Sequence, residues 1–227
     1  MHDDQLENPL ALEGTPFRQE LSAPMLDQII SRLDDMHAAR EHAINAGRHV
    51  IRTSANAIRA LHRGDIATAT SLLDAAADKL HAIRTATTSH PNVYWAGYVQ
   101  DAMKEYAEAA ITAAILGNAA IPSPETLGVE DAAYLNALAE AASELRRDSL
   151  DALRAGDTER AVGLLDQMDT VYTGLVTVDF PDAITGGLRR TTDQLRAVLE
   201  RTRGDVTLSV RQDRLERALR AMDEHLR

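Results

Sequence analysis

The chain has 227 residues, of which 44% are hydrophobic but only 4% aromatic, and it contains no cysteine. This length can bury a large core in one helical domain or two small ones, while the lack of cysteine excludes disulfides and thiolate metal sites. The formal net charge of −11 makes nucleic acid an unfavourable partner for the chain as a whole, unless its basic residues are clustered.

Lysine is rare, since Lys79 and Lys104 are the only two among 24 basic residues. An acidic chain with so little lysine is typical of a halophilic host, where high internal salt screens the repulsion between like charges. No apolar run reaches membrane-spanning length, and the acidic N-terminus does not resemble a signal peptide. We therefore expect a soluble, cytoplasmic protein that does not enter a membrane.

The first part of the chain predicts an arm followed by a long helix. Residues 1–23 lack periodicity and contain prolines, which predicts a flexible N-terminal arm in front of a helical domain over residues 24–227. A helix is predicted over residues 25–63, because apolar residues recur at nearly heptad spacing and Gly64 follows. A helix of this length must form a long hairpin arm or part of an oligomer.

Four arginines of this helix fall within about 60° of one another at 100° per residue, beside the apolar seam; we call them the arginine stripe, and they are Arg48, Arg52, Arg59 and Arg63. They could pair with acidic neighbours such as Glu41 and Asp65. They could also form a track for the phosphates of a nucleic acid. The sequence leaves both alternatives open.

The rest of the chain also follows helical periodicity. Asp65 and Asp157 are typical helix N-caps, and helices are predicted over residues 66–87, 98–116, 129–155, 158–178 and 184–203. Gly204 and Asp205 are expected to separate the last of these from a final amphipathic helix. No strand-like alternation occurs, so the sequence predicts an all-α bundle of six or seven long antiparallel helices.

Two of these helices carry paired carboxylates. Asp101, Glu105 and Glu108 lie in one narrow arc of the 98–116 helix, apart from the residues expected to pack, and Glu140 and Glu144 lie one turn apart in the 129–155 helix. Charges spaced in this way most often form a solvated face. Two helices that each present paired carboxylates could instead hold a hard divalent cation between them. No histidine follows these glutamates at i+3, so the signature of di-iron bundles is missing.

Five segments, taken in order and spacing, resemble the translin superfamily, in particular translin-associated factor X and the archaeal translin-like proteins. The segments are KEYAEAAI (104–111), SELRR (143–147), GDTERAVGLLDQMDTVYTGL (156–175), DFPDAITGGLRRTTDQL (179–195) and LERTRGDVTL (199–208). The resemblance extends over about residues 27–220. It implies a seven-helix protomer that assembles into a closed shell, commonly an octamer, around single-stranded or structured RNA.

The resemblance also implies which residues carry activity. In the factor X branch, two glutamates of one helix and an aspartate of a later helix form a metal-dependent ribonuclease site; the translin branch has largely lost these residues and only binds. Glu105 and Glu108 match the catalytic pair, Glu140 stands where the active branch has aspartate, and Glu144 follows four residues later. Ser143 matches translin rather than the active branch, so the chain combines features of both.

We therefore expect an endoribonuclease that depends on Mg²⁺ or Mn²⁺ and acts on single-stranded RNA inside a hexameric or octameric shell, with or without a paralogous subunit. Glu105, Glu108 and Glu140 would be catalytic metal ligands, Glu144 would complete or orient the site, and the arginine stripe would contact phosphates. The first alternative is a translin-like oligomer that holds RNA or single-stranded DNA without cutting it. The second is a helical scaffold for other proteins.

Overall fold

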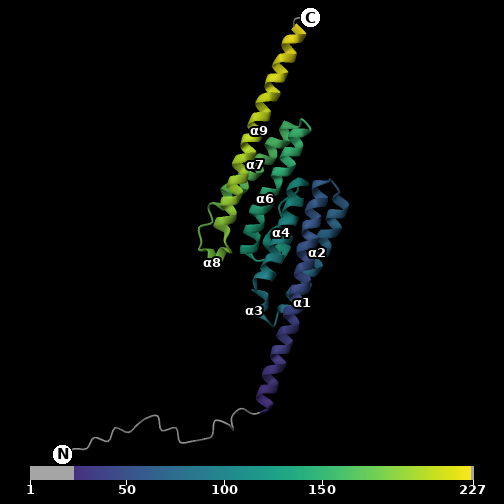
Figure 1. Ribbon diagram of the computed structural model, residues 1–227, viewed down its shortest axis with the longest axis vertical. Coiled ribbons are helices and arrows are strands. Elements are labelled where there is room, and N and C mark those ends of the chain that lie inside the picture. Colours follow the sequence, from purple (N-terminus) through teal and green to yellow (C-terminus); the bar gives the residue numbers. More distant parts are fainter. Residues whose placement is uncertain (1–22, 226–227) are drawn as a thin grey trace, which may run out of the picture.

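The computed structural model describes residues 23–225, which form six long helices and three one-turn helices without a strand in that range. The predicted all-α fold is therefore confirmed. The predicted arm lies outside the described residues, except for Ala23, with which the first helix begins. The helices are α1 (Ala23–His62), α2 (Ile66–Thr87), α3 (Pro91–Tyr94), α4 (Gly97–Leu116), α5 (Pro124–Leu127), α6 (Asp131–Arg154), α7 (Thr158–Leu175), α8 (Asp182–Thr185) and α9 (Leu188–His225) (Figure 1).

Two tight helical hairpins, α1–α2 and α6–α7, are closed in the same way. Gly64 and Gly156 adopt left-handed backbone angles, with φ of 73° and 79°, which glycine tolerates without steric cost. Asp65 and Asp157 then cap the following helices, and their carboxylates accept hydrogen bonds from the backbone N–H groups of Thr68 (3.2 Å) and Arg160 (2.9 Å). Both predicted N-caps are thus present.

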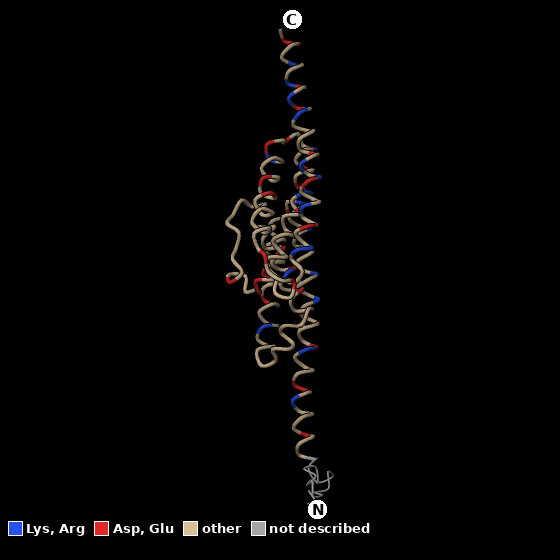
Figure 2. Tube along the Cα trace, turned by 90° about the vertical axis from the view of Figure 1, so that its left-hand side faces the viewer, with Lys and Arg blue, Asp and Glu red and all other residues tan. Residues whose placement is uncertain are grey.

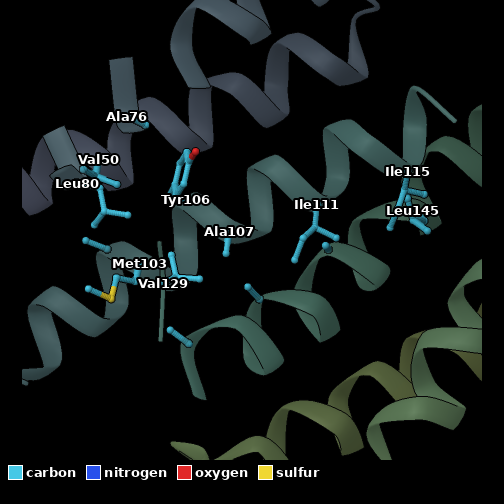
Figure 3. Packing of buried hydrophobic residues seen from close by; sticks show 14 of the residues in the cluster. Val50, Ala76, Leu80, Met103, Tyr106, Ala107, Ile111, Ile115, Val129 and Leu145 are labelled. Carbon is cyan, nitrogen blue, oxygen red and sulfur yellow. The ribbon is translucent and has the colours of Figure 1, made fainter. Parts of the chain in front are cut away.

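The core is centred on α4, which packs against α1, α2 and α6. Met103, Ile111 and Leu145 are fully buried there (Figure 3). Alanines such as Ala107 and Ala141 are also fully buried, and their small side chains allow helices to approach closely. This close contact between α4 and α6 brings the backbones of the two acidic helices together.

The predicted break at Gly204 is wrong, because α9 runs without interruption from Leu188 to His225. Leu199, Thr202 and Val206 are buried on both sides of the glycine. Arg146 of α6 also donates hydrogen bonds to Thr202 (3.1 Å) and Asp205 (2.8 Å). Glycine inside a helix costs only about 1 kcal/mol relative to alanine, so these tertiary contacts are sufficient to keep the helix continuous.

The first part of α1 and the last part of α9 project from opposite ends of the bundle (Figure 1). Both projections carry exposed apolar side chains, which are Leu26, Ile30 and Leu33 in α1 and Leu208, Leu215, Leu219 and Met222 in α9. Exposed apolar faces of this extent are typical of protein–protein contact surfaces. No helix within residues 23–225 is both long and apolar enough to cross a membrane.

We expect these projecting faces to be covered by other copies of the chain. Multi-angle light scattering at several salt concentrations should then give the mass of a hexamer or octamer. Replacing Leu215 and Leu219 together by glutamate should lower that mass, because buried charge opposes association. A monomer under every condition would contradict the expected oligomer.

Candidate metal centre

Three predicted metal ligands come together where α4 and α6 face each other. Glu105 and Glu108 project from α4, and Glu140 projects from α6. One potential ligand atom from each residue lies within 4.8 Å of those of the other two. We call these three carboxylates the acidic cluster. Its members share oxygen-donor chemistry and a spacing suited to a single cation.

The acidic face of α4 is not a solvated face. Glu108 is only 8% exposed, and Thr112, one turn later, is fully buried. Glu105 and Glu140 are partly buried, and only Asp101 of this face is exposed. The acidic face of α4 is partly buried because α6 packs against it. As a result, α4 is covered on this face as well as on its apolar seam.

The pKa of Glu108 is raised to about 8, mainly by burial and further by the charges of Glu140, Glu105 and Glu144, while Lys104 opposes the rise. No residue in the range 23–225 hydrogen-bonds to the Glu108 carboxylate. A buried carboxylate without a hydrogen-bond partner is costly in its charged form. Glu108 is therefore largely protonated at neutral pH unless a cation compensates its charge.

Lys104 is a member of the site that the sequence analysis did not identify. Its Nζ donates a hydrogen bond to Oε2 of Glu140 (2.6 Å) and lies 3.3 Å from Oε1 of Glu105. Burial, the largest single influence, lowers the pKa of Lys104, but the hydrogen bonds and charges of Glu140 and Glu105 together raise it above its usual value. Lys104 therefore remains an ammonium that neutralises part of the acidic cluster.

Glu144 was predicted to join the metal ligands, but the structure does not bring it into the acidic cluster. Its Oε2 lies 2.9 Å from Nε2 of His62, whose Nδ1 lies 2.9 Å from Oδ2 of Asp148. The His62 side chain is only 3% exposed. His62 thus joins the last turn of α1 to α6, a contact that the sequence analysis missed. The metal-ligand role of Glu144 stays a prediction.

All four side chains of the arginine stripe are exposed, three of them on α1 and that of Arg63 directly after its end. Among residues 23–225, no guanidinium nitrogen of the stripe lies within 4.0 Å of a carboxylate oxygen. The arginines that form ion pairs in this range are not members of the stripe. Glu41, which was a candidate partner, pairs with Arg40 instead (2.7 Å). In Figure 2, basic positions recur, interspersed with acidic ones, down the long edge of the molecule that ends in the two projecting helices. The stripe thus presents guanidinium groups that form no ion pair within that range, although the charge of Arg63 helps to lower the pKa of Asp65.

Comparison with known proteins gives a consistent assignment. No family model matches the chain. An uncharacterized protein of Methanocaldococcus jannaschii is 26% identical over 197 residues, which covers 86% of this chain and 87% of that protein. The fold of apo-NeC3PO is similar, with a TM-score of 0.75 over 83% of this chain and 98% of that one, but at 20% identity this shows the fold alone.

The similarity to AfC3PO is stronger in sequence. Its crystal structure and the structure of its complex with duplex RNA both match with a TM-score of 0.74 and 32% identity. The match covers 82% of this chain and 96% of that one. Since both fold and sequence agree over nearly all of AfC3PO, the chain belongs to the translin superfamily.

Proposed function

We propose that this chain is a metal-dependent endoribonuclease that acts on single-stranded RNA. The observation that carries the proposal is the convergence of Glu105, Glu108 and Glu140 from two helices to within 4.8 Å. In the resemblance to the active branch of the superfamily, Glu105 and Glu108 match the two catalytic glutamates. Glu140 stands where that branch has its catalytic aspartate. The complex of AfC3PO with duplex RNA supports an RNA substrate rather than a protein partner.

The residues of the acidic cluster fit Mg²⁺ or Mn²⁺. Mg²⁺ prefers one or more carboxylates together with several waters, and its ligands at about 2.1 Å lie at most about 4.2 Å apart. The spacing of the cluster is close to this value, so small rotations of the glutamate side chains would suffice. Glu108 also supplies a buried carboxylate whose charge a cation would compensate.

A metal ion bound here would lower the pKa of a water and offset charge that develops on the scissile phosphate. Glu105 and Glu140, which are partly exposed, would bind it from opposite helices. The carboxyl of Glu108 can hold a proton at neutral pH and release it when its charge is compensated. His62 holds Glu144 beside the acidic cluster. The arginine stripe, on α1 and directly after it, would bind RNA phosphates through its guanidinium groups.

The direct test is cleavage of single-stranded RNA labelled at either end. We expect internal cuts with Mg²⁺ or Mn²⁺ and none with EDTA. RNA that is bound but never cut with either metal would instead assign the chain to the non-catalytic branch. One observation favours that alternative: Glu140, which replaces the aspartate of the active branch, is already bound by Lys104.

We expect the arginine stripe to supply phosphate contacts. Replacing Arg48, Arg52 and Arg59 together by alanine should weaken RNA binding for all sequences alike. It should also reduce the slope of log K against log [salt] by about 2, since each phosphate contact on a single strand contributes about 0.7. Fluorescence anisotropy over a range of salt concentrations measures both quantities.

A matched control removes three exposed arginines of α9, namely Arg196, Arg201 and Arg214. This variant carries the same change in net charge as the stripe variant. If both variants lose affinity equally, overall charge and not the stripe determines binding. If the folded stripe variant keeps its affinity and salt slope, the stripe is only a solvated face.

A further inference from the structure

Lys104 stands out from the other basic residues of the chain. It is one of two lysines among 24 basic residues, and the other, Lys79, is exposed on α2. The Lys104 side chain is 22% exposed and lies between the two helices that carry the acidic cluster. A half-buried cation inside a proposed cation site requires an explanation, because it repels any ion that binds there.

The distances indicate what the ammonium does. It is 2.6 Å from Oε2 of Glu140 and 3.3 Å from Oε1 of Glu105, so it contacts two of the three carboxylates of the cluster, one on each helix. A divalent ion that bound Glu105 and Glu140 would compete with the ammonium for these two carboxylates. The ammonium therefore joins two of the three carboxylates of the acidic cluster across the two helices.

We propose that Lys104 is an internal counter-cation, which joins Glu105 to Glu140 in the metal-free protein and has to leave them when a divalent ion binds. The inference rests on the proposed metal site and concerns its regulation. Lysine suits such a role, because its ammonium is a point charge on a flexible stem, whereas the planar guanidinium of arginine binds carboxylates in a fixed fork. Competition by Lys104 makes the affinity of the empty site for metal weak.

The displaced ammonium would affect RNA binding as well. Once it leaves the two carboxylates, the partly exposed Lys104 is a free cation beside the site of cleavage. An RNA phosphate is the anion that it would meet there. Metal and RNA then bind cooperatively, since each stabilises the arrangement that favours the other, and the coupling is reciprocal.

Isothermal titration of the metal-free protein with Mn²⁺, without RNA and at one pH and salt concentration, tests the competition. We expect Lys104→Gln to bind Mn²⁺ at least about tenfold more tightly than wild type. Lys104→Met provides a second neutral variant if the first does not fold. Lys104→Arg should bind Mn²⁺ no more tightly than wild type, because it keeps the charge, and Lys79→Gln is the matched control.

The outcomes separate this inference from the proposed function. If wild type and Lys104→Gln bind Mn²⁺ equally while Glu105→Gln abolishes binding, the metal site stands and the counter-cation does not. If neither wild type nor Lys104→Gln binds Mn²⁺, both ideas are overturned. If Lys79→Gln tightens binding as much as Lys104→Gln, net charge and not direct competition is responsible.

A second titration includes a single-stranded 2′-O-methyl oligonucleotide, which lacks the 2′-hydroxyl groups of RNA. We expect this oligonucleotide to tighten Mn²⁺ binding by about tenfold in wild type and by less than about threefold in Lys104→Gln. Equal factors in the two proteins would overturn the proposed coupling through Lys104.

Discussion

Glu105→Gln is expected to lower the rate of Mg²⁺-dependent RNA cleavage by at least about 10²–10³-fold, the loss typical of removing one preorganised electrostatic contact in an active site. The amide keeps the shape of the side chain but cannot supply a charged ligand. Glu105 is partly exposed, so the variant should fold and still bind RNA. Single-turnover cleavage and RNA affinity, measured in parallel, separate the two effects.

Asp101→Asn is the matched control for this substitution. Asp101 lies one turn before Glu105 on the same side of α4, but it is exposed and outside the acidic cluster. Its loss removes the same charge and should leave cleavage nearly unchanged. Full activity in Glu105→Gln, or an equal loss in Asp101→Asn, would refute the assignment of the site.

Glu140 permits a more specific variant of the same test. Glu140→Gln should lower the rate of cleavage by a factor similar to that expected for Glu105→Gln. Glu140→Asp restores the residue of the active branch and should retain or increase activity. Loss of activity in Glu140→Asp would mean that the longer glutamate is needed for the geometry of this particular site.

The second large effect concerns pH and Glu108. Burial raises the pKa of Glu108 to about 8 in the folded protein, from an ordinary value of 4.5. Between these values the folded state binds more protons than the unfolded state, so the free energy of unfolding contributed by Glu108 falls as pH rises from about 4.5 to about 8. Each unit by which the pKa differs corresponds to about 1.4 kcal/mol, so the total reaches a few kcal/mol.

Glu108→Gln should remove this dependence. In EDTA we expect the variant and wild type to unfold at similar urea concentrations at pH 5, and the variant to be more stable by a few kcal/mol at pH 8.5. Other groups also titrate over this range, so the difference between the two proteins is the quantity to measure. A difference that is the same at pH 5 and pH 8.5 would contradict the raised pKa.

A bound metal ion should reverse the loss of stability that Glu108 causes at high pH in wild type, because a cation stabilises the charged form of Glu108. We expect Mg²⁺ to raise the stability of wild type at pH 8.5 and to have a smaller effect on Glu108→Gln. Metal binding near pH 7 should also release a proton, which titrations in buffers of different ionisation enthalpy detect. Binding without proton release would mean that Glu108 does not ligate the ion.

The fold could largely be predicted from the sequence, because helix periodicity and capping are local. Asp65 and Asp157 follow glycines and precede apolar runs, which is sufficient to locate two hairpins. The helix break predicted at Gly204 was wrong because the contacts that decide it are not local. The contacts that keep α9 continuous come from Arg146, more than 50 residues earlier in the chain, as the separations of 56 and 59 residues show.

The acidic cluster could be predicted only in part. The spacing of Glu105 and Glu108 places them on one side of α4, but burial of that side depends on α6, which the spacing cannot reveal. Lys104 and His62 were missed because their partners are distant in sequence, at separations of 36 residues for Glu140 and 82 for Glu144. Two signals were available in retrospect: the scarcity of lysine, and the spacing of Glu144 and Asp148 one turn apart on α6.

Three carboxylates of α4 and α6 are proposed to bind one divalent ion. Anomalous diffraction from crystals grown with Mn²⁺ tests this proposal most directly, because the signal locates the metal without reference to activity. We expect one strong peak within coordination distance of Glu105, Glu108 and Glu140, and the loss of this peak in crystals of Glu105→Gln. Crystals in which Mn²⁺ occupies other sites while these three carboxylates remain without a peak would contradict the claim.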